Sequence, residues 1–310
     1  MNKKTIPLLF GLSVLLLAAC GKKPVHGWLN EDDVRIAIDA PFRPIMEEQL
    51  QQFSMLHPTA QLKPLYCSED SALRLLVADS LSSCVATRKL KPSELEVIHS
   101  RRHTARQELI ATDAFALIVS RSCPDTVITL DEVKGIVSGR ITRWEQLAGS
   151  SRRSELKLLF DHSGSSTVRY MRDSLCAGAE LQGNVFAQGS SEAVIDFVKE
   201  SPDVIGVVGV DWLREANSAT LTDFGGLPVR VMLVQRDASS YYRRPYQYYI
   251  GTGEYPLTRS VYAITTDPRQ RSQEKLLWHW LKEQKGQLIF CNNSQLLPMM
   301  PVQVKAVKVR

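Results

Sequence analysis

The sequence lacks the motifs that mark metal sites, serine hydrolases and nucleic-acid-binding proteins. It has no C-x-x-C pair, no H-E-x-x-H segment and no histidine cluster at ligand spacing, so we expect no metal site. It has no G-x-S-x-G turn, which argues against an α/β-hydrolase. The net charge is only +5 and no basic stripe is interleaved with aromatic residues, so we expect no nucleic-acid partner. Repeats and low-complexity tracts are also absent, and the composition is that of an ordinary globular protein.

Long apolar runs are missing everywhere except at the N-terminus. There, Lys3 and Lys4 precede an apolar stretch over residues 6–19, a pattern typical of a secretory signal. The stretch is shorter than the roughly 20 residues that a bilayer span requires. It ends in L-A-A-C-G at residues 17–21, which resembles the lipobox of bacterial lipoproteins. We therefore expect a signal peptide over 1–19, lipidation of Cys20, a tether over 20–30 and an exported body anchored at the membrane surface. The alternative is a buried N-terminal helix.

Cysteine usage gives no disulfide framework. Besides Cys20 there are five cysteines, an odd number at spacings that match no known pattern. An exported compartment permits disulfides, so their pairing stays open. Cys67 and Cys84 flank apolar runs, and we expect them to be small core residues.

Hydrophobic periodicity predicts an α/β fold. Alternating apolar and polar residues predict strands over 34–39 and 61–66, and a short apolar run predicts a buried strand over 84–87. Helical patterns at 44–57 and after Ser68 separate them, so the first hundred residues are interpreted as β-α-β-α-β, typical of a parallel sheet covered by helices. The rest of the body continues in the same way, with strands predicted at 114–120, 156–160, 204–210, 229–234 and 259–265, and helices after Thr129 and at 168–175, 191–199 and 272–286.

The segment from Gly164 to Thr167 is the strongest candidate for an anion site. It follows a predicted strand and opens a predicted helix, whose first turn carries unpaired N–H groups and a partial positive charge. Hydroxyl side chains there add donors for phosphate, sulfate or carboxylate. Plain N-capping is the alternative. Ser68 opens another helix and Thr87-Arg88 ends another strand, and open α/β sheets bind ligands at the carboxyl ends of their strands.

Several segments resemble the phosphate-binding-protein family, the substrate-binding proteins of bacterial phosphate ATP-binding-cassette (ABC) importers. The similarity covers essentially the whole body, and its motifs are an apolar strand at 111–119, the segment I-T-L-D-E-V-K-G-I-V-S-G-R-I-T-R-W-E-Q-L at 128–147, and segments at 255–262 and 286–298. The resemblance implies a periplasmic-binding-protein-like fold of two α/β lobes, each a mainly parallel sheet covered by helices. Two hinge crossings would join the lobes near 117–119 and 231–234. Lobe 1 would hold residues 31–116 and 235–310, and lobe 2 residues 117–234.

The resemblance also implies where a ligand binds. The sequence G-S-S-T at 164–167 takes the place of the family's G-S-G-T phosphate loop, Ser68 matches a second helix start, and Thr87-Arg88 match a strand end. The loop after the first strand, at residues 39–42, offers only backbone donors to a ligand. The implied function is non-enzymatic and without cofactor: a monomer captures an oxyanion, most simply phosphate, and delivers it to an ABC permease. The implied ligand-binding residues are Pro41, Phe42, Ser68, Thr87, Arg88, Gly164, Ser165, Ser166 and Thr167.

Departures from the family pattern concern charge. Asp161 stands where the family often has an arginine shortly before the phosphate loop, and Ser166 replaces a glycine. The candidates for the missing positive charge are Arg43, Arg88 and Arg169. A carboxylate that accepts a hydrogen bond from the O–H of hydrogen phosphate would reject sulfate, which has no proton to donate. The candidates for that carboxylate are Asp39, Glu69, Asp70 and Asp161.

Two other functions remain as alternatives. One is a divergent surface or sensory lipoprotein that keeps the fold and binds another ligand. The second is a surface hydrolase, for which Asp161, His162 and Ser165 are present but are not arranged in any known triad motif. The tyrosine- and arginine-rich segment 241–249 bears on the first alternative, because it is either an exposed contact surface or, as we expect, a hairpin of the first lobe that packs its tyrosines.

Overall fold

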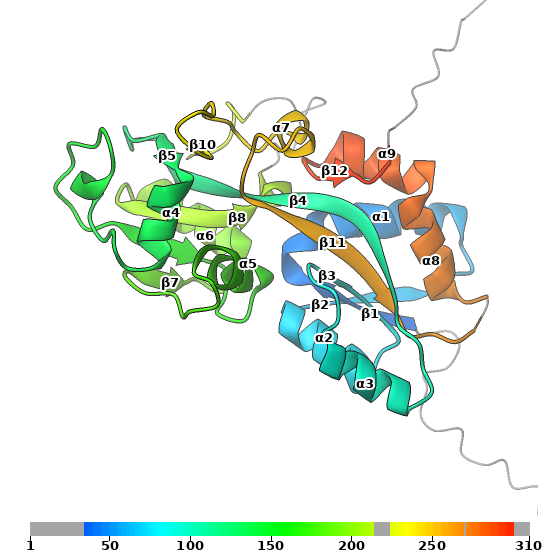
Figure 1. Cartoon of the computed structure of the whole chain (residues 1–310). Helices are drawn as coiled ribbons and strands as arrows, with labels where there is room; N and C mark the ends of the chain where they lie inside the picture. The colour runs from blue at the N-terminus through cyan, green and yellow to red at the C-terminus, as the bar shows by residue number, and fades with distance from the viewer. Residues whose placement is uncertain (1–33, 214–223, 270, 301–310) are drawn as a thin grey trace, which may run out of the picture.

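The computed structural model describes residues 34–213, 224–269 and 271–300. The predicted signal peptide, Cys20 and the tether lie outside the described residues. Figure 1 shows two α/β lobes side by side, joined by long strands that cross between them. Among the described residues, no helix combines the length and apolarity that crossing a membrane requires.

The first lobe is built on a sheet in the order β2-β1-β3-β11-β4. Strands β1, β2 and β3 are parallel, and β11 runs antiparallel to both β3 and β4. Helices α1, α8 and α9 cover one face and α2 and α3 the other (Figure 1). The elements are β1 (Val34–Asp39), α1 (Arg43–Leu56), β2 (Leu62–Cys67), α2 (Glu69–Val77), β3 (Ser83–Ala86), α3 (Pro92–Ser100), β4 (Arg106–Ser120), β11 (Thr258–Thr265), α8 (Gln273–Lys282), α9 (Gln284–Asn293) and β12 (Leu297–Pro298), which pairs with β4.

The second lobe continues the sheet through β4 in the order β4-β8-β6-β7. Strands β6, β7 and β8 are parallel to one another, whereas β4 is antiparallel to β8 and to β9. Each lobe therefore has the three parallel, helix-covered strands that the sequence predicts, and antiparallel strands complete both sheets. The elements are β5 (Val127–Thr129), α4 (Leu130–Val137), β6 (Lys157–Phe160), α5 (Ser166–Tyr170), β7 (Val185–Ala187), α6 (Ser191–Glu200), β8 (Val204–Gly209), β9 (Val229–Val231) and β10 (Leu233–Gln235), which pairs with β5. Helix α7 (Gln247–Gly251) follows and contacts β12 of the first lobe.

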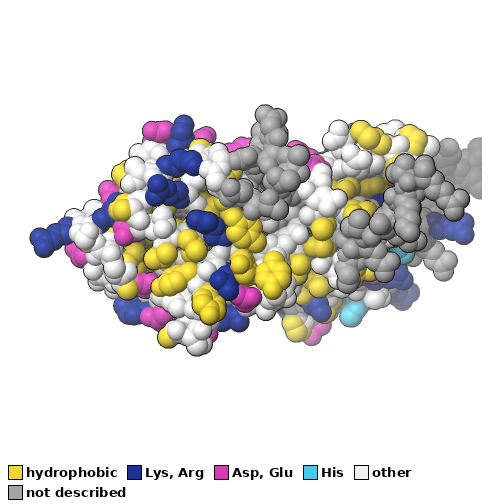
Figure 2. Space-filling model, turned by 90° about the horizontal axis from the view of Figure 1, so that it is seen from above, with side chains coloured by type: hydrophobic (Ala, Val, Ile, Leu, Met, Phe, Trp, Pro, Cys, Tyr) yellow, Lys and Arg dark blue, Asp and Glu magenta, His cyan; other side chains and the backbone are white. Residues whose placement is uncertain are grey.

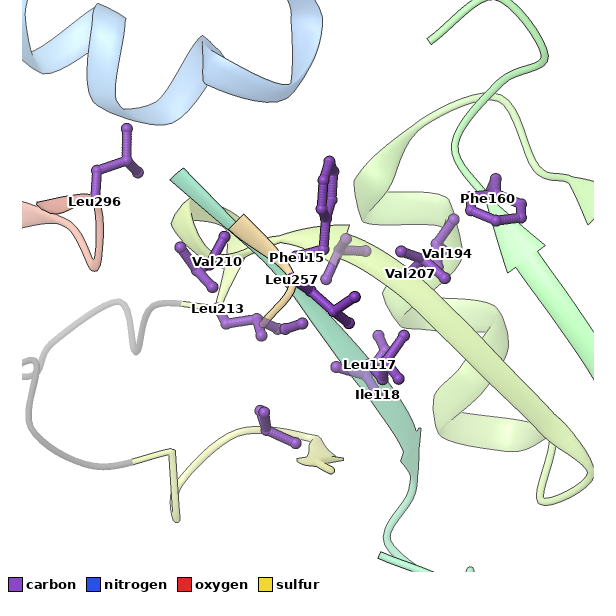
Figure 3. Close-up of a cluster of buried hydrophobic side chains, with 14 of the residues drawn as sticks. Phe115, Leu117, Ile118, Phe160, Val194, Val207, Val210, Leu213, Leu257 and Leu296 are labelled. Atoms are coloured by element: carbon purple, nitrogen blue, oxygen red, sulfur yellow. The ribbon is translucent and has the colours of Figure 1, made fainter. Parts of the chain in front are cut away.

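Strand β4 links the lobes by changing its partner. Ala114 is the last residue that pairs with β11, opposite Thr258, and Phe115 is the first that pairs with β8, opposite Gly209. The exchange lies slightly before the predicted crossing at 117–119. Figure 3 shows Phe115, Leu117 and other apolar side chains of β4 packed beside β8 and α6. Burial of each such side chain contributes roughly 1.5–3 kcal/mol, so the strand that joins the lobes also anchors the second core.

Local sequence signals explain the helix starts. The Ser68 hydroxyl accepts from Ser71 N at 3.2 Å, as predicted for an N-cap. Thr129 and Glu132 form the predicted capping box, with the Thr129 hydroxyl accepting from Glu132 N at 3.2 Å and the Glu132 carboxylate accepting from Thr129 N at 2.7 Å. The first of these helix starts bears on function, because Ser68 lies at the boundary between the lobes, next to Gly164.

The prediction of one helix over 272–286 is wrong. The chain is extended at Glu283, which separates α8 from α9. Gly286 follows the break, and a Cβ there would lie 2.2 Å from the Trp280 carbonyl oxygen. Only a glycine allows this close approach, so the two helices fold back on each other rather than continuing.

Two shorter predictions also need correction. The helix expected from Val168 begins earlier, at Ser166, and widens into a π-turn over Met171–Leu175. The segment 241–249 is a hairpin only at the bridge between Val234 and Arg243, after which it leads into helix α7. Tyr246 and Tyr249 pack against the core as predicted, whereas Tyr241 and Tyr248 are 75% and 70% exposed. Figure 2 views the molecule from above, the side on which α7 lies in Figure 1, and shows hydrophobic side chains beside Lys and Arg near the middle of this face.

Candidate binding site between the lobes

The carboxyl ends of strands from both lobes meet at the lobe boundary. Asp39 is the last residue of β1, and Thr87 and Asp161 directly follow β3 and β6. All three side chains are buried. The helix starts at Ser68 and Gly164 also face each other, since a Cβ on Gly164 would lie 3.8 Å from the Ser68 Cβ. This is the edge at which open α/β sheets bind ligands.

Most of the predicted site residues come together at this boundary. Pro41 and Phe42 form a buried 3-10 turn after β1. Ser68 caps α2 and is half-buried, and Thr87 is buried at the end of β3. In the second lobe, the Ser165 hydroxyl caps α5 by accepting from Val168 N at 3.2 Å. Its neighbours Ser166 and Thr167 are fully buried, and Gly164 is partly exposed.

Arg259 is a site residue that sequence reasoning missed. Its Nε donates to Asp113 Oδ2 at 2.8 Å, and its Nη1 donates to the Ser166 hydroxyl at 2.5 Å. The guanidinium lies between two aromatic rings, 5.0 Å from the Phe42 centroid and 4.2 Å from that of Phe115. Its Nη2 is buried and has no hydrogen-bond partner among the described residues. One guanidinium thus joins both lobes and keeps one donor available.

A signal for Arg259 is present in the sequence. Arg259 shares the buried face of β11 with Val261 and Ala263, two positions apart along the strand, and Asp113 lies next to the apolar run of β4. Charged residues in buried strands are rarely tolerated without a partner. The two residues lie directly opposite each other in the sheet register, which the sequence alone does not reveal.

Asp39 is a fully buried carboxyl group that faces this cluster. Burial, with a smaller contribution from the Glu69 carboxylate, raises the pKa of Asp39 to about 8, although the Arg259 guanidinium acts to lower it. The Ser166 hydroxyl is close enough to lower this pKa, yet it makes no hydrogen bond of good geometry with either oxygen of Asp39. Asp161 Oδ1 is likewise buried without a partner among the residues that the structure describes. The boundary therefore holds unsatisfied acceptors as well as a donor.

Glu69 and Arg169 tie the lobes together beside this cluster. Glu69 Oε1 accepts from the Thr87 backbone N and hydroxyl, both at 2.6 Å, and its carboxylate pairs with the Arg169 guanidinium of the second lobe. Arg169 Nη2 also donates to the Thr87 hydroxyl at 2.7 Å. Although burial acts to raise it, the pKa of Glu69 is held below its ordinary value by Arg169 and Thr87. Glu69 is thus an ionised partner of Arg169.

Further contacts close the boundary on the side of β8. Trp212 Nε1 donates to the Pro41 carbonyl oxygen at 2.8 Å, and Ile45 N donates to Asp211 Oδ2 at 2.7 Å. Both bonds join the turn after β8 to the turn and helix after β1. The two lobes are therefore in direct contact on both sides of Arg259.

The arginines predicted from the sequence have other partners. Arg88 pairs with both carboxylate oxygens of Glu94, at 2.7 and 2.8 Å, within its own lobe. The Arg43 guanidinium lies 4.7 Å from the centroid of the Tyr66 ring. Arg169 is engaged by Glu69 and Thr87. Among the four arginines, Arg259 is the one with a buried nitrogen that lacks a partner within the described part of the chain.

The arrangement is suited to binding a ligand that both accepts and donates hydrogen bonds. Arg259 and the hydroxyls of Ser166 and Thr167 supply donors, while Asp39 and Asp161 supply acceptors. No hydrogen bond among the described residues joins the His162 ring to Ser165 or Asp161, as a nucleophile and base would require. Within the same described ranges, no group of three His, Cys, Asp or Glu side chains is placed to hold a metal ion.

Comparisons with known proteins indicate the family to which the chain belongs. A family model described as the PBP superfamily domain matches residues 26–282. The phosphate-binding protein PstS of Bacillus subtilis is 21% identical over 315 residues, which covers 98% of this chain and 96% of the relative. PstS of Borreliella burgdorferi is 23% identical over 223 residues, which covers 69% of this chain and 75% of the relative.

The fold also matches that of solved structures. A phosphate ABC transporter substrate-binding protein from Clostridium perfringens, solved with bound phosphate, superimposes with a TM-score of 0.67 at 17% identity, covering 86% of this chain and all of that one. A phosphate transport receptor from Vibrio cholerae gives a TM-score of 0.64 at 15% identity, with coverage of 86% and 100%. These structures share the two-lobed fold of this chain, and the family model shows that the chain belongs to the PBP superfamily.

Proposed function

We propose that this protein binds inorganic phosphate between its lobes and delivers it to the permease of an ABC importer. The family supports a solute-binding role, and the relatives named above are phosphate-binding proteins. The observation that carries the proposal is Arg259, which contacts Ser166 of the phosphate-loop segment and has Nη2 unpaired among the described residues. An anion at this point would complete the hydrogen bonding of a buried guanidinium.

Hydrogen phosphate suits this site better than sulfate does. Its unprotonated oxygens would accept from Arg259 and from the phosphate-loop hydroxyls, while its O–H would donate to Asp39 or Asp161. Sulfate has no proton, so it would leave the buried acceptor on Asp161 unpaired beside a negative charge. Asp39 keeps its own proton up to about pH 8 in the unliganded protein, so the discrimination rests on Asp161. Arg259 would thereby supply the charge that the family's missing arginine would otherwise provide, and Asp161 would occupy the place of that arginine.

The family setting suggests how the protein reaches its ligand. We propose an exported monomer that Cys20 anchors to a membrane through lipid, with lobe 1 formed by residues 31–116 and 235–310 and lobe 2 by 117–234. Hinge motion at the two crossings would open the contacts among Glu69, Arg169 and Thr87 to admit phosphate. Such a protein captures and releases its ligand without catalysis.

Thr167→Ala tests the placement of the ligand. Thr167 is fully buried in the first turn of α5, in the segment that replaces the family's phosphate loop. Loss of one hydroxyl that bonds a charged ligand should weaken phosphate binding by about tenfold to 100-fold, measured by titration calorimetry. The exposed Thr104→Ala is the matched control and should bind as the unchanged protein does. Equal affinities for the two variants would place the ligand elsewhere.

The excess of carboxylates gives weight to one alternative. Asp39, Glu69 and Asp161 are all buried at the boundary, against the two guanidinium groups of Arg169 and Arg259. A surface or sensory lipoprotein of this fold with a less negative ligand would also fit that balance. Absence of phosphate binding by the unchanged protein, with the fold intact, would favour this alternative.

A further inference from the structure

We propose that the far end of the first lobe holds a second binding site, one for a small oxyanion. A cavity of about 80 Å³ lies there between the first residues of β4, the last residues of β11 and helix α8. Since a water needs roughly 10–15 Å³ measured in this way, the space holds several waters or one anion of the size of sulfate or acetate. The residues that line it are chiefly Arg106, Glu108, Thr265, Lys275, Trp278 and His279.

The cavity is separate from the boundary between the lobes. Thr265 pairs with Ser83, the first residue of β3, whereas the interlobe site lies at the opposite end of that strand. Thr265 lies six positions after Arg259 in β11, which corresponds to about 20 Å of strand. Figure 1 shows the same separation, with α8 and the starting end of β4 on the side of the first lobe that faces away from the second.

Lys275 provides the first reason to expect an anion. It is only 8% exposed, yet its ammonium group makes no hydrogen bond or ion pair with any described residue. Its ammonium nitrogen is not among the buried atoms that lack a partner, so the stem of Lys275 is buried while its charged end reaches accessible space. An anion in the cavity would provide that partner.

Trp278 provides a second, independent reason. Its indole N–H is buried and has no acceptor among the residues that the structure describes. Buried tryptophans ordinarily find a hydrogen-bond acceptor for this group. Trp278 and Lys275 both line the cavity, so an oxyanion held by Lys275 would lie beside the Trp278 side chain.

The charge at the rim is also positive. The carboxylate of Glu108 is already paired with Lys282 at 2.6 Å, so it does not neutralise the cavity. Arg106 has no side-chain partner within the described ranges, and His279 adds a further ring nitrogen. The donors thus outnumber the available acceptors, which favours a small oxyanion over a cation or a neutral ligand.

Nuclear magnetic resonance of the tryptophan indole groups tests the second site directly. Sulfate and acetate are titrated at constant ionic strength into the ¹⁵N-labelled protein, with chloride as the reference. We expect the Trp278 indole resonance, assigned with Trp278→Phe, to shift saturably with at least one of the two probes. Trp212, whose indole N–H bonds Pro41 at the lobe boundary, reports separately on the interlobe site.

Charge-removing variants separate a built site from a general salt effect. Lys275→Met and the rim variant Arg106→Gln should each raise the half-saturating concentration by about tenfold or more. Lys134→Met, on the exposed face of α4, should leave it unchanged. A Trp278 response that does not saturate, that chloride reproduces, or that both cavity variants leave intact would overturn the proposal. Failure of phosphate to bind between the lobes would leave this result unaffected.

Discussion

Replacing Arg259 with methionine is expected to weaken phosphate binding by at least about 100-fold. Hydrogen bonds to a charged group contribute roughly 1.5–3 kcal/mol each, and the guanidinium both supports the Ser166 hydroxyl and offers Nη2 to the ligand. Methionine retains much of the apolar contact with Phe42 and Phe115 but removes every donor. Titration calorimetry of the variant with phosphate measures the loss.

The same substitution should also destabilise the fold, so it needs a second variant. Asp113 would remain as a buried charge without its partner, which costs about 3–5 kcal/mol in the free energy of unfolding. The double variant Arg259→Met/Asp113→Asn removes that charge and should recover most of the stability without recovering phosphate binding. A double variant that binds phosphate as tightly as the unchanged protein would show that Arg259 acts only through the fold.

Arg88→Met is the matched control, because Arg88 was the arginine proposed from the sequence resemblance. In the structure it pairs with Glu94 in a partly exposed position. We expect its replacement to change phosphate affinity by less than about threefold, since a partly exposed pair contributes little. A 100-fold loss in Arg88→Met instead of Arg259→Met would restore the assignment made from the sequence.

Asp39→Asn is expected to change how stability depends on pH when no ligand is bound. The pKa of Asp39 is raised by burial from 3.8 to about 8, so between these pH values the folded protein keeps a proton that the unfolded chain has lost. Stability therefore falls as the pH rises through this window and levels off above pH 8. At 1.36 kcal/mol for each pKa unit, the fall attributable to this group is on the order of 5 kcal/mol.

Asparagine cannot ionise, so the variant should lack that component of the fall. Urea unfolding at pH 5 and pH 8.5 measures it: Asp39→Asn should gain stability relative to the unchanged protein at pH 8.5 and much less at pH 5. Asp196→Asn, an exposed change on α6, serves as the control and should leave the pH dependence intact. If Asp39→Asn loses as much stability between pH 5 and pH 8.5 as the unchanged protein does, Asp39 is not the buried acid responsible for the fall.

Features encoded by nearby residues were predictable from the sequence. Ser68 and Thr129 cap helices through contacts with residues three positions on, so the signal and the structure lie within one turn. The hydroxyl-rich start of α5 was predictable for the same reason, although its exact first residue was not. Strand β4 was predicted only from residue 114, because its first half, from Arg106, is more polar and lacks the apolar run of the second half.

Features that depend on distant residues were not predictable. Asp113 and Arg259 are 146 positions apart, and their pairing requires the register of β4 against β11. The break between α8 and α9 depends on how closely Gly286 approaches Trp280. The raised pKa of Asp39 follows from the burial of β1 at the lobe boundary, which no local pattern encodes.

Competition between phosphate and sulfate tests the central proposal most directly. Phosphate is titrated calorimetrically into the unchanged protein at pH 7, first in buffer alone and then with a large excess of sulfate at matched ionic strength. We expect micromolar or tighter binding of phosphate, with an affinity that sulfate leaves within about threefold, because sulfate cannot donate to the buried acceptor at Asp161. No heat of binding, or complete displacement by sulfate, would contradict phosphate recognition at the lobe boundary.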